Sequence, residues 1–217
     1  MTDLLKKEIK LSASPLSFYF ILSSLLTFVP GYPILVGVFF ATLGIFYSFQ
    51  SMRENNDIKY SMLLPISKSD IVKSKFYFVV FVEALNFILM TAFTLVRMIF
   101  LSKTHVYVTN VLMPANLVFL GFSLIVFGLY NYVFVSGFFK TAYYFGKPFV
   151  IYCITAFLAV FIFESLRYIP KIKILSSLGF EQILPQISVL IIGIILFLLL
   201  TVLAIKRSEK SFEKTDL

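Results

Sequence analysis

Long apolar runs separated by short polar segments dominate this chain of 217 residues. Helices that cross a bilayer need roughly 20 mostly apolar residues to pass a hydrocarbon core of about 30 Å. Six runs approach or exceed that length, at residues 16–29, 34–51, 76–100, 111–139, 148–166 and 187–205. The pattern predicts an all-α membrane protein, with six transmembrane helices in one domain over residues 14–205.

The N-terminal segment 1–13 has a different pattern. Apolar residues alternate with charged ones there: Leu4, Leu5, Ile9 and Leu11 with Lys6, Lys7, Glu8 and Lys10. This predicts an amphipathic interface helix that lies on the membrane with its lysines toward anionic lipid. The alternative is a solvated tail. Because the first apolar run is short, we expect its helix to take in residues from Leu11 onward.

Basic residues are concentrated in alternate loops. Fourteen of the 19 Lys and Arg lie before span one, between spans two and three, between spans four and five, or after span six: Lys6, Lys7, Lys10, Arg53, Lys59, Lys68, Lys73, Lys75, Lys140, Lys147, Lys206, Arg207, Lys210 and Lys214. Cytoplasmic loops carry such an excess. We therefore predict that both termini are cytoplasmic, with residues 206–217 forming a frayed tail.

The composition supports a bilayer rather than a nucleic acid as the partner. The formal net charge is +8, yet the basic residues sit at span ends, as topology signals do. With one cysteine and one histidine, the chain has no intrachain disulfide, and we expect no metal site.

The segment between spans five and six, residues 168–186, is broken by Pro170, Gly179 and Pro185 but remains apolar. Irregular backbone at membrane depth needs protein around it. We predict a broken re-entrant segment at the outer face. A folded external loop on the headgroups is the alternative.

The polar loop 52–75 is split by Pro65. Before the proline, Ile58 and Met62 share one helical face and Tyr60 and Leu64 another, which predicts a short surface helix. After it, Ser67 and Asp70 have the spacing of a capping box. A helix from Ser67 to Leu101 would be about 50 Å long, so its first turns would project into the cytoplasm.

Few polar residues fall within the spans. Glu83 and Asn86 share a face of the third span, about 12 Å beyond Lys75, and are candidates for a substrate pathway together with Asn131. Hydrogen bonds between helices are the alternative, and are our interpretation of Asn116. Glu164 and Arg167, three residues apart, predict an ion pair within span five.

Three stretches of the loop 52–75 carry a resemblance to a known family. They are Asp57-Ile58-Lys59-Tyr60, the run from Leu63 to Lys68, and Asp70-Ile71-Val72 with Lys75. They resemble the cytoplasmic loop of type 2 ABC exporter permeases of bacteria, and the tail from Ser211 to Leu217 resembles that family's ending. The layout looks closest to the compact permeases that include the phenol-soluble modulin exporter subunits.

The resemblance implies a permease in the bacterial plasma membrane that is not catalytic by itself. Two cytoplasmic ABC ATPase subunits would hold ATP and Mg, and a second permease, identical or sister, would complete the pathway. This chain has no P-loop motif and would bind no cofactor. The residues implied to couple it to the ATPase are Asp57, Lys59, Tyr60, Leu63, Leu64, Pro65, Ser67, Lys68 and Asp70.

The spans are rich in Phe, Leu and Ile and poor in charge, which favours an apolar or amphipathic cargo. We therefore expect export of a substrate such as a cytolytic or antimicrobial peptide or a lipophilic drug. The alternatives are a non-transporting membrane anchor or immunity protein, and a small ion-coupled carrier. A membrane-embedded enzyme is disfavoured because the spans lack a nucleophile–base set.

Overall fold

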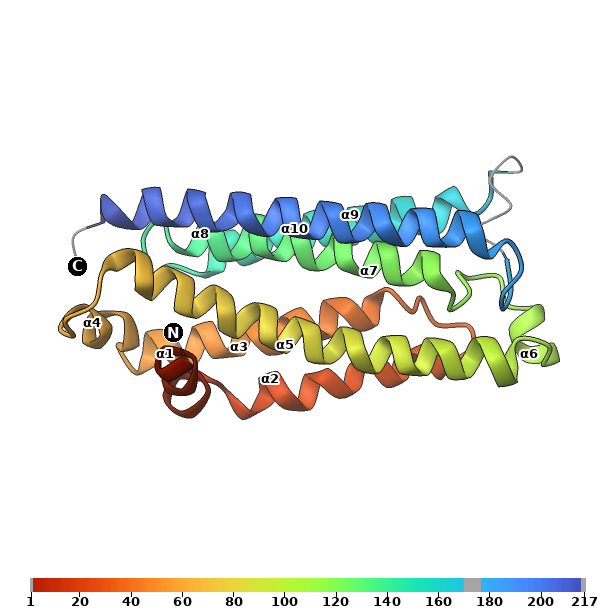
Figure 1. Ribbon diagram of the computed structural model, residues 1–217, viewed down its shortest axis with the longest axis horizontal. Helices are drawn as coiled ribbons and strands as arrows, with labels where there is room; N and C mark the ends of the chain where they lie inside the picture. The colour runs from red at the N-terminus through yellow and green to blue at the C-terminus, as the bar shows by residue number, and fades with distance from the viewer. Residues whose placement is uncertain (1, 170–176, 216–217) are drawn as a thin grey trace.

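The structure, a computed structural model, describes residues 2–169 and 177–215. Six helical rods lie along its long axis (Figure 1). They are α2 Pro15–Tyr19 continued by the 3-10 helix η2 Phe20–Phe28, α3 Val36–Glu54, α5 Lys68–Val96 continued by the π-helix η3 Arg97–Leu101, α7 Leu117–Leu129 continued by the π-helix η4 Tyr130–Val135 and by α8 Ser136–Phe138, α9 Gly146–Leu166, and α10 Ile183–Glu213. The described residues form no strand.

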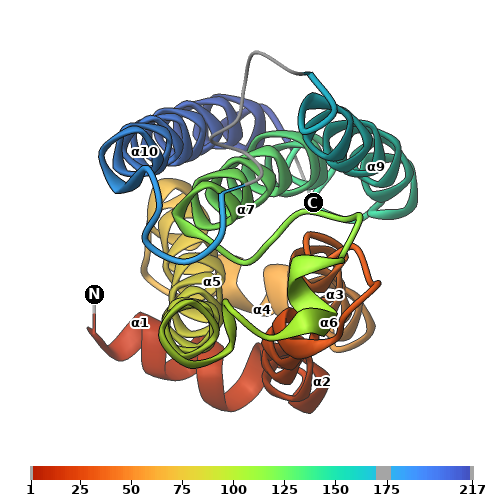
Figure 2. The same cartoon turned by 90° about the vertical axis from the view of Figure 1, so that its right-hand side faces the viewer.

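Short helices cover the two ends of the rods. α1 Thr2–Lys7, the π-helix η1 Glu8–Ser12 and α4 Asp57–Met62 lie at one end, and α6 His105–Val108 lies at the other (Figure 1). Viewed along the axis, α7, α9 and α10 form one half of the bundle and α2, α3 and α5 form the other (Figure 2).

Among the described residues, four helices are long and apolar enough to cross a membrane: Lys68–Leu101, Leu117–Phe138, Gly146–Leu166 and Ile183–Glu213. The apolar helix Pro15–Phe28 is shorter. The prediction of an α-helical membrane protein is thus confirmed, while six crossings stay a prediction. Span three has the predicted extent, because the Ser67 side chain accepts from the Asp70 backbone N–H and closes the capping box before Lys68.

The first rod gains length through its geometry. It does not take in residues from Leu11 onward, because Ala13 is extended and Ser14 caps a new helix by accepting from the Leu16 backbone N–H. Nine of its residues instead form the 3-10 helix η2. Since a 3-10 helix rises about 2.0 Å per residue against about 1.5 Å in an α-helix, residues 15–28 reach about 25 Å.

Close backbone contact joins α7 to α10. A Cβ added to Gly193 would lie 2.4 Å from the carbonyl oxygen of Gly121, so only glycine permits this crossing. Small residues at such contacts are typical of membrane helices, which gain little hydrophobic energy from leaving lipid. The outward sides of α9 and α10 remain apolar and exposed, for example at Phe161, Ile154 and Leu198.

Both ends of the chain lie at the same end of the bundle (Figure 1). This end holds α1, α4, the connection 139–145 and the last turns of α10, and we call it the basic end. The segments that carry the 14 basic residues described above all meet there. The tail expected to fray is helical as far as Glu213, so that prediction was wrong, and Asp216 and Leu217 lie outside the described residues.

The segment 168–186 is only partly described. Pro170 and the other residues to 176 lie outside the described residues, so the predicted re-entrant segment is untested there. Residues 177–182 form turns rather than short helices, and α10 begins at Ile183, with Pro185 in its first turn. The Gln186 amide donates to Ser177, Gly179 and Glu181 and accepts from the Leu117 backbone N–H, which holds this segment over the ends of α7 and α10.

The orientation gives a labelling prediction. In a Cys153→Ala background, a cysteine at Thr141, exposed at the basic end, should resist an impermeant thiol reagent in intact cells because that end faces the cytoplasm. A cysteine at Thr104, exposed at the opposite end, should react. Permeabilised cells provide the control, since both sites should then label. Reaction at Thr141 in intact cells would show that the topology is inverted.

Candidate functional site

The helix α4 presents an exposed face at the basic end. It starts after Asn56, whose φ of 52° turns the chain sharply out of α3. Asp57, Ile58 and Ser61 are buried against the bundle, whereas Tyr60 is 56% exposed. Leu63, directly after the helix, is 84% exposed. Large apolar side chains held outward on a rigid helix are typical of a surface that receives a partner.

A buried cluster of four charges holds the opposite face of α4. The Lys75 ammonium of α5 contacts the carboxylates of Glu8 and Asp57. The Lys7 ammonium lies 2.7 Å from Asp57 Oδ1 and 3.3 Å from Glu8 Oε1. We call these four residues the ion cluster. Its charges balance, and Lys75 is fully buried.

Hydroxyl groups complete the hydrogen bonding of the ion cluster. Ser61 Oγ accepts from Lys7 at 2.7 Å, and Ser74 Oγ donates to Glu8 at 3.2 Å. Burial opposes ionisation of the Asp57 carboxyl, but the charge of Lys75 and the hydrogen bonds from Lys7 and Lys75 outweigh it and lower the pKa of Asp57 below its usual value. The ion cluster therefore joins α1, η1, α4 and α5 through charged groups.

The start of α5 also holds the end of α10. The Lys68 ammonium donates to the carbonyl oxygens of Thr215 at 2.8 Å and Glu213 at 3.2 Å. A cation at the carbonyl end of a helix is favourable because the macrodipole is negative there. Ser69 Oγ adds a hydrogen bond of 2.5 Å to Glu209. The last turns of α10 and the first turn of α5 thus form one unit.

The nine residues implied to couple to an ATPase differ in exposure and fall into three groups. The exposed ones form one surface, which we call the α4 surface: Lys59, Tyr60, Leu63, Pro65 and Ser67. Leu64, Lys68 and Asp70 are partly buried. Asp57 is buried in the ion cluster and is out of reach of a partner, so its place indicates support for α4 rather than contact.

Glu83 and Asn131 meet deep in the bundle. Asn131 Nδ2 donates to Glu83 Oε2 at 3.0 Å and to Thr201 Oγ1 at 3.1 Å, which joins α5, η4 and α10. Glu83 Oε1 is buried without a hydrogen bond and lies beside a cavity of about 120 Å³ whose other lining residues are apolar. Asn86 is not part of this group, because it donates to the carbonyl oxygen of Ile21 in η2.

Other polar residues lie differently from our expectations. Asn116 is the N-cap of α7, accepting from the Phe119 backbone N–H, and it also donates to the Ser177 carbonyl. Glu164 and Arg167 attract one another electrostatically, as their spacing predicts, but their hydrogen bonds go to the segment before α7. Glu164 accepts from the Met113 backbone N–H and Arg167 donates to the Asn110 carbonyl.

Sequence reasoning missed the inward side of the N-terminal helix. Lys7 was expected to face anionic lipid with the other lysines, but Lys7 and Glu8 face α4 and α5, while Lys6 and Lys10 are exposed. A signal was present, because Glu8 interrupts a lysine-rich stretch and its charge needs a buried partner if the helix packs inward. Arg97 was also missed; it is buried, donates to the Thr27 carbonyl and lies 4.2 Å from the Tyr107 ring centre.

Within the described part of the chain, no group of three or more His, Cys, Asp or Glu side chains lies close enough to hold a metal ion. The side chains that gather are instead arranged for support and contact. A bundle of long apolar helices, with a basic end that presents a supported short helix, defines an integral membrane protein.

The family model described as "ABC-2 family transporter protein" matches residues 3–213. This chain therefore belongs to the ABC-2 transporter family and is a membrane permease subunit of an ABC transporter. Membership of this family implies that the chain associates with an ABC ATPase. Comparison with curated proteins gives no match, and comparison with solved structures gives none either.

The ion cluster predicts a large effect of one lysine. Lys75→Met should destabilise the protein by about 3–5 kcal/mol, because Glu8 and Asp57 would remain buried beside a single cation. The measurement is thermal or denaturant unfolding of the detergent-solubilised protein. Lys73→Met is the matched control, since Lys73 is 39% exposed and pairs with Glu209 at the surface, which should contribute less than about 1 kcal/mol. Equal effects of the two substitutions would contradict this assignment.

Proposed function

We propose that this chain is the permease of an ATP-driven exporter and that the α4 surface receives its ATPase. The observation that carries the proposal is the contrast between the two faces of α4. One face exposes Tyr60 and Leu63, and the other is bonded to α5 through the ion cluster. A partner that pushes on this surface would move α5 as well.

The path from the surface into the bundle is short. Lys75 of the ion cluster and Glu83 lie on the same helix, eight residues or about 12 Å apart. A shift of α5 would therefore change the contact of Glu83 with Asn131 on η4. ATP binding by an ATPase docked at the basic end would in this way alter the packing of α5 against η4 and α10.

The assembly that we propose contains two copies of the ATPase, which hold ATP and Mg, and a second permease, identical or sister. This chain would carry out no catalysis itself. It would lie in a bacterial plasma membrane with six crossings, the basic end in the cytoplasm. A non-transporting membrane anchor or immunity protein is the second candidate, and it would have no use for a supported α4 surface.

Docking at the α4 surface can be tested with one exposed leucine. Leu63→Asp should weaken association with the ATPase by roughly 30-fold, since central apolar contacts contribute about 2 kcal/mol or more. Co-purification and a binding titration of the two subunits measure this. Leu184→Asp is the matched control, because Leu184 is 76% exposed at the opposite end of the bundle. Unchanged binding of the Leu63→Asp permease would exclude α4 as the docking element.

We further propose that the exported substrate is hydrophobic or amphipathic, such as a cytolytic or antimicrobial peptide or a lipophilic drug. The apolar side chains on the buried faces are mainly Phe, Val, Ile and Ala, which do not compensate the desolvation of a strongly polar solute. Glu83, with one oxygen free of hydrogen bonds beside an apolar cavity, would interact with a polar or cationic group of the cargo.

Reconstituted permease and ATPase test the cargo class. Amphipathic peptides should stimulate ATP hydrolysis, and Glu83→Gln should raise the concentration of a cationic peptide needed for half-maximal stimulation by about tenfold, because a hydrogen bond to a charged group contributes about 1.5–3 kcal/mol. Glu164→Gln, near the outer end of α9, is the control. Stimulation by sugars or inorganic ions alone would refute an amphipathic cargo.

A further inference from the structure

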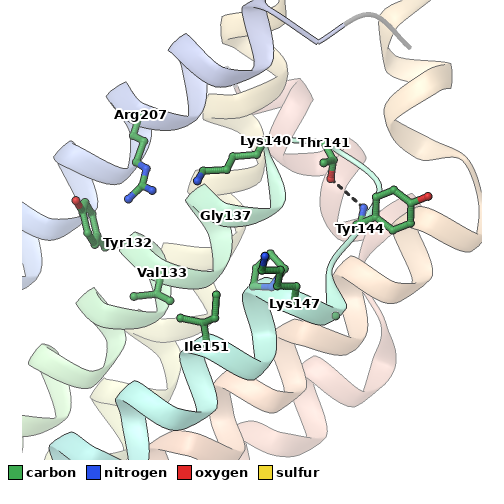
Figure 3. A pocket seen from close by; sticks show the side chains of 11 residues that line it. Tyr132, Val133, Gly137, Lys140, Thr141, Tyr144, Lys147, Ile151 and Arg207 are labelled. Carbon is green, nitrogen blue, oxygen red and sulfur yellow. Dashed lines mark hydrogen bonds between the residues drawn. The ribbon is translucent and has the colours of Figure 1, made fainter.

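A cavity of about 680 Å³ lies at the basic end, between η4, α8, the start of α9 and the end of α10 (Figure 3). Its lining includes three cations and two aromatic residues: Lys140, Lys147, Arg207, Tyr132 and Tyr144. Neither the α4 surface nor Glu83 lines this cavity, so it is a separate site from those named in the proposed function.

The charge of the cavity is entirely positive. No acidic residue lines it, and no ion pair found among the described residues includes Lys140, Lys147 or Arg207. Lys140 and Arg207 extend into the same space between α8 and α10 (Figure 3). Like charges that share a cavity repel one another, and an anion between them reverses the sign of the interaction. The cavity is therefore complementary to a phosphate-like group.

The backbone leaves this space open for a physical reason. α9 and α10 each pack against η4, which forms the floor between them. Gly137 lets α9 approach closely, because a Cβ there would lie 2.9 Å from Pro148 Cβ. The chain then turns through Ala142, with φ of 52°, and this places Lys140 and Lys147 on opposite sides of the turn.

Apolar surface continues from the cavity toward the middle of the bundle. Ile151 lines the cavity, and Ile154 and Leu158 follow it on the same side of α9 at helical spacing, both more than half exposed. On α10, Leu203 lies one turn before Arg207 and is 45% exposed. Cations at the end of the bundle followed by exposed apolar residues match the two parts of a lipid, a charged headgroup and an acyl chain.

We propose that this cavity binds an anionic glycerophospholipid from the leaflet at the basic end. The phosphate lies among Lys140, Lys147 and Arg207, and the acyl chains lie along Ile151 and Ile154 of α9 and Leu203 of α10. A zwitterionic lipid lacks the net negative charge that three cations require, and free phosphate lacks the apolar part that the flanking residues contact.

The chain contains no Trp, so a single introduced Trp reports on this cavity alone. Tyr144 lines the cavity and is 68% exposed, and Tyr144→Trp places the reporter there. The permease alone is reconstituted into phosphatidylcholine bilayers that contain small fractions of brominated phosphatidylglycerol or brominated phosphatidylcholine, whose bromine quenches Trp fluorescence. Phosphatidylglycerol should bind at least about fivefold more tightly, the preference that one cation near the membrane supplies.

Two triple variants separate this site from general surface charge. In the reporter protein, Lys140→Gln, Lys147→Gln and Arg207→Gln together should equalise the two lipids. Lys10→Gln, Lys59→Gln and Lys214→Gln together remove the same charge from exposed positions of the basic end outside the cavity and should preserve the preference. If both variants lost the preference for phosphatidylglycerol, the preference would arise from overall surface charge, and the proposed site would be refuted.

The reporter protein with an intact cavity is itself decisive, even if a triple variant fails to fold. Equal quenching by both brominated lipids would overturn the proposal. Millimolar inorganic phosphate that abolishes the preference for phosphatidylglycerol would show a free-anion site in place of a lipid site. Because no ATPase or cargo is present, these outcomes leave the proposed export function untouched.

Discussion

The ion cluster is the interaction on which the basic end depends. Two carboxylates and two ammonium groups are removed from water together, and each is tolerated there only because the others are present. Since the four groups come from α1, η1, α4 and α5, these segments can separate only at the cost of exposing or isolating a charge. The outward display of Tyr60 and Leu63 and the position of the first turns of α5 both follow from this constraint.

Within the bundle, the π-helix η4 brings together features that the chain presents separately. It places Asn131 between Glu83 and Thr201, it supports both α9 and α10, and it contributes Tyr132 and Val133 to the cationic cavity. π-Helical turns inside α-helices are rare and occur frequently at functional sites. The π-helix η4 thus connects the buried contact of Asn131 with Glu83 to the cationic cavity at the basic end.

Helical class, the membrane character and the capping box at Ser67 were predictable, because each depends on composition or on residues within one turn of each other. The separation of Tyr60 from Ile58 likewise followed from helical spacing. The inward packing of Lys7 and Glu8 was missed, because the one local signal, an acidic residue in a lysine-rich stretch, does not identify α4 and α5 as the elements that the helix packs against. The contacts of Glu164 and Arg167 to residues 110–113 could not be predicted either, because they depend on how segments far apart in the sequence meet.

The contact of Gly121 with Gly193 has a mechanical consequence. At this contact the two backbones touch, with no side chain between them. α7 and α10 therefore lack the flexible side-chain layer that lets packed helices slide past each other, and they should move as one rigid unit. Any rearrangement of the bundle must then carry both helices together. The interfaces filled by longer side chains, such as those of α5 with η2 and α10, are more compliant, and the shape changes of this protein should be sought there.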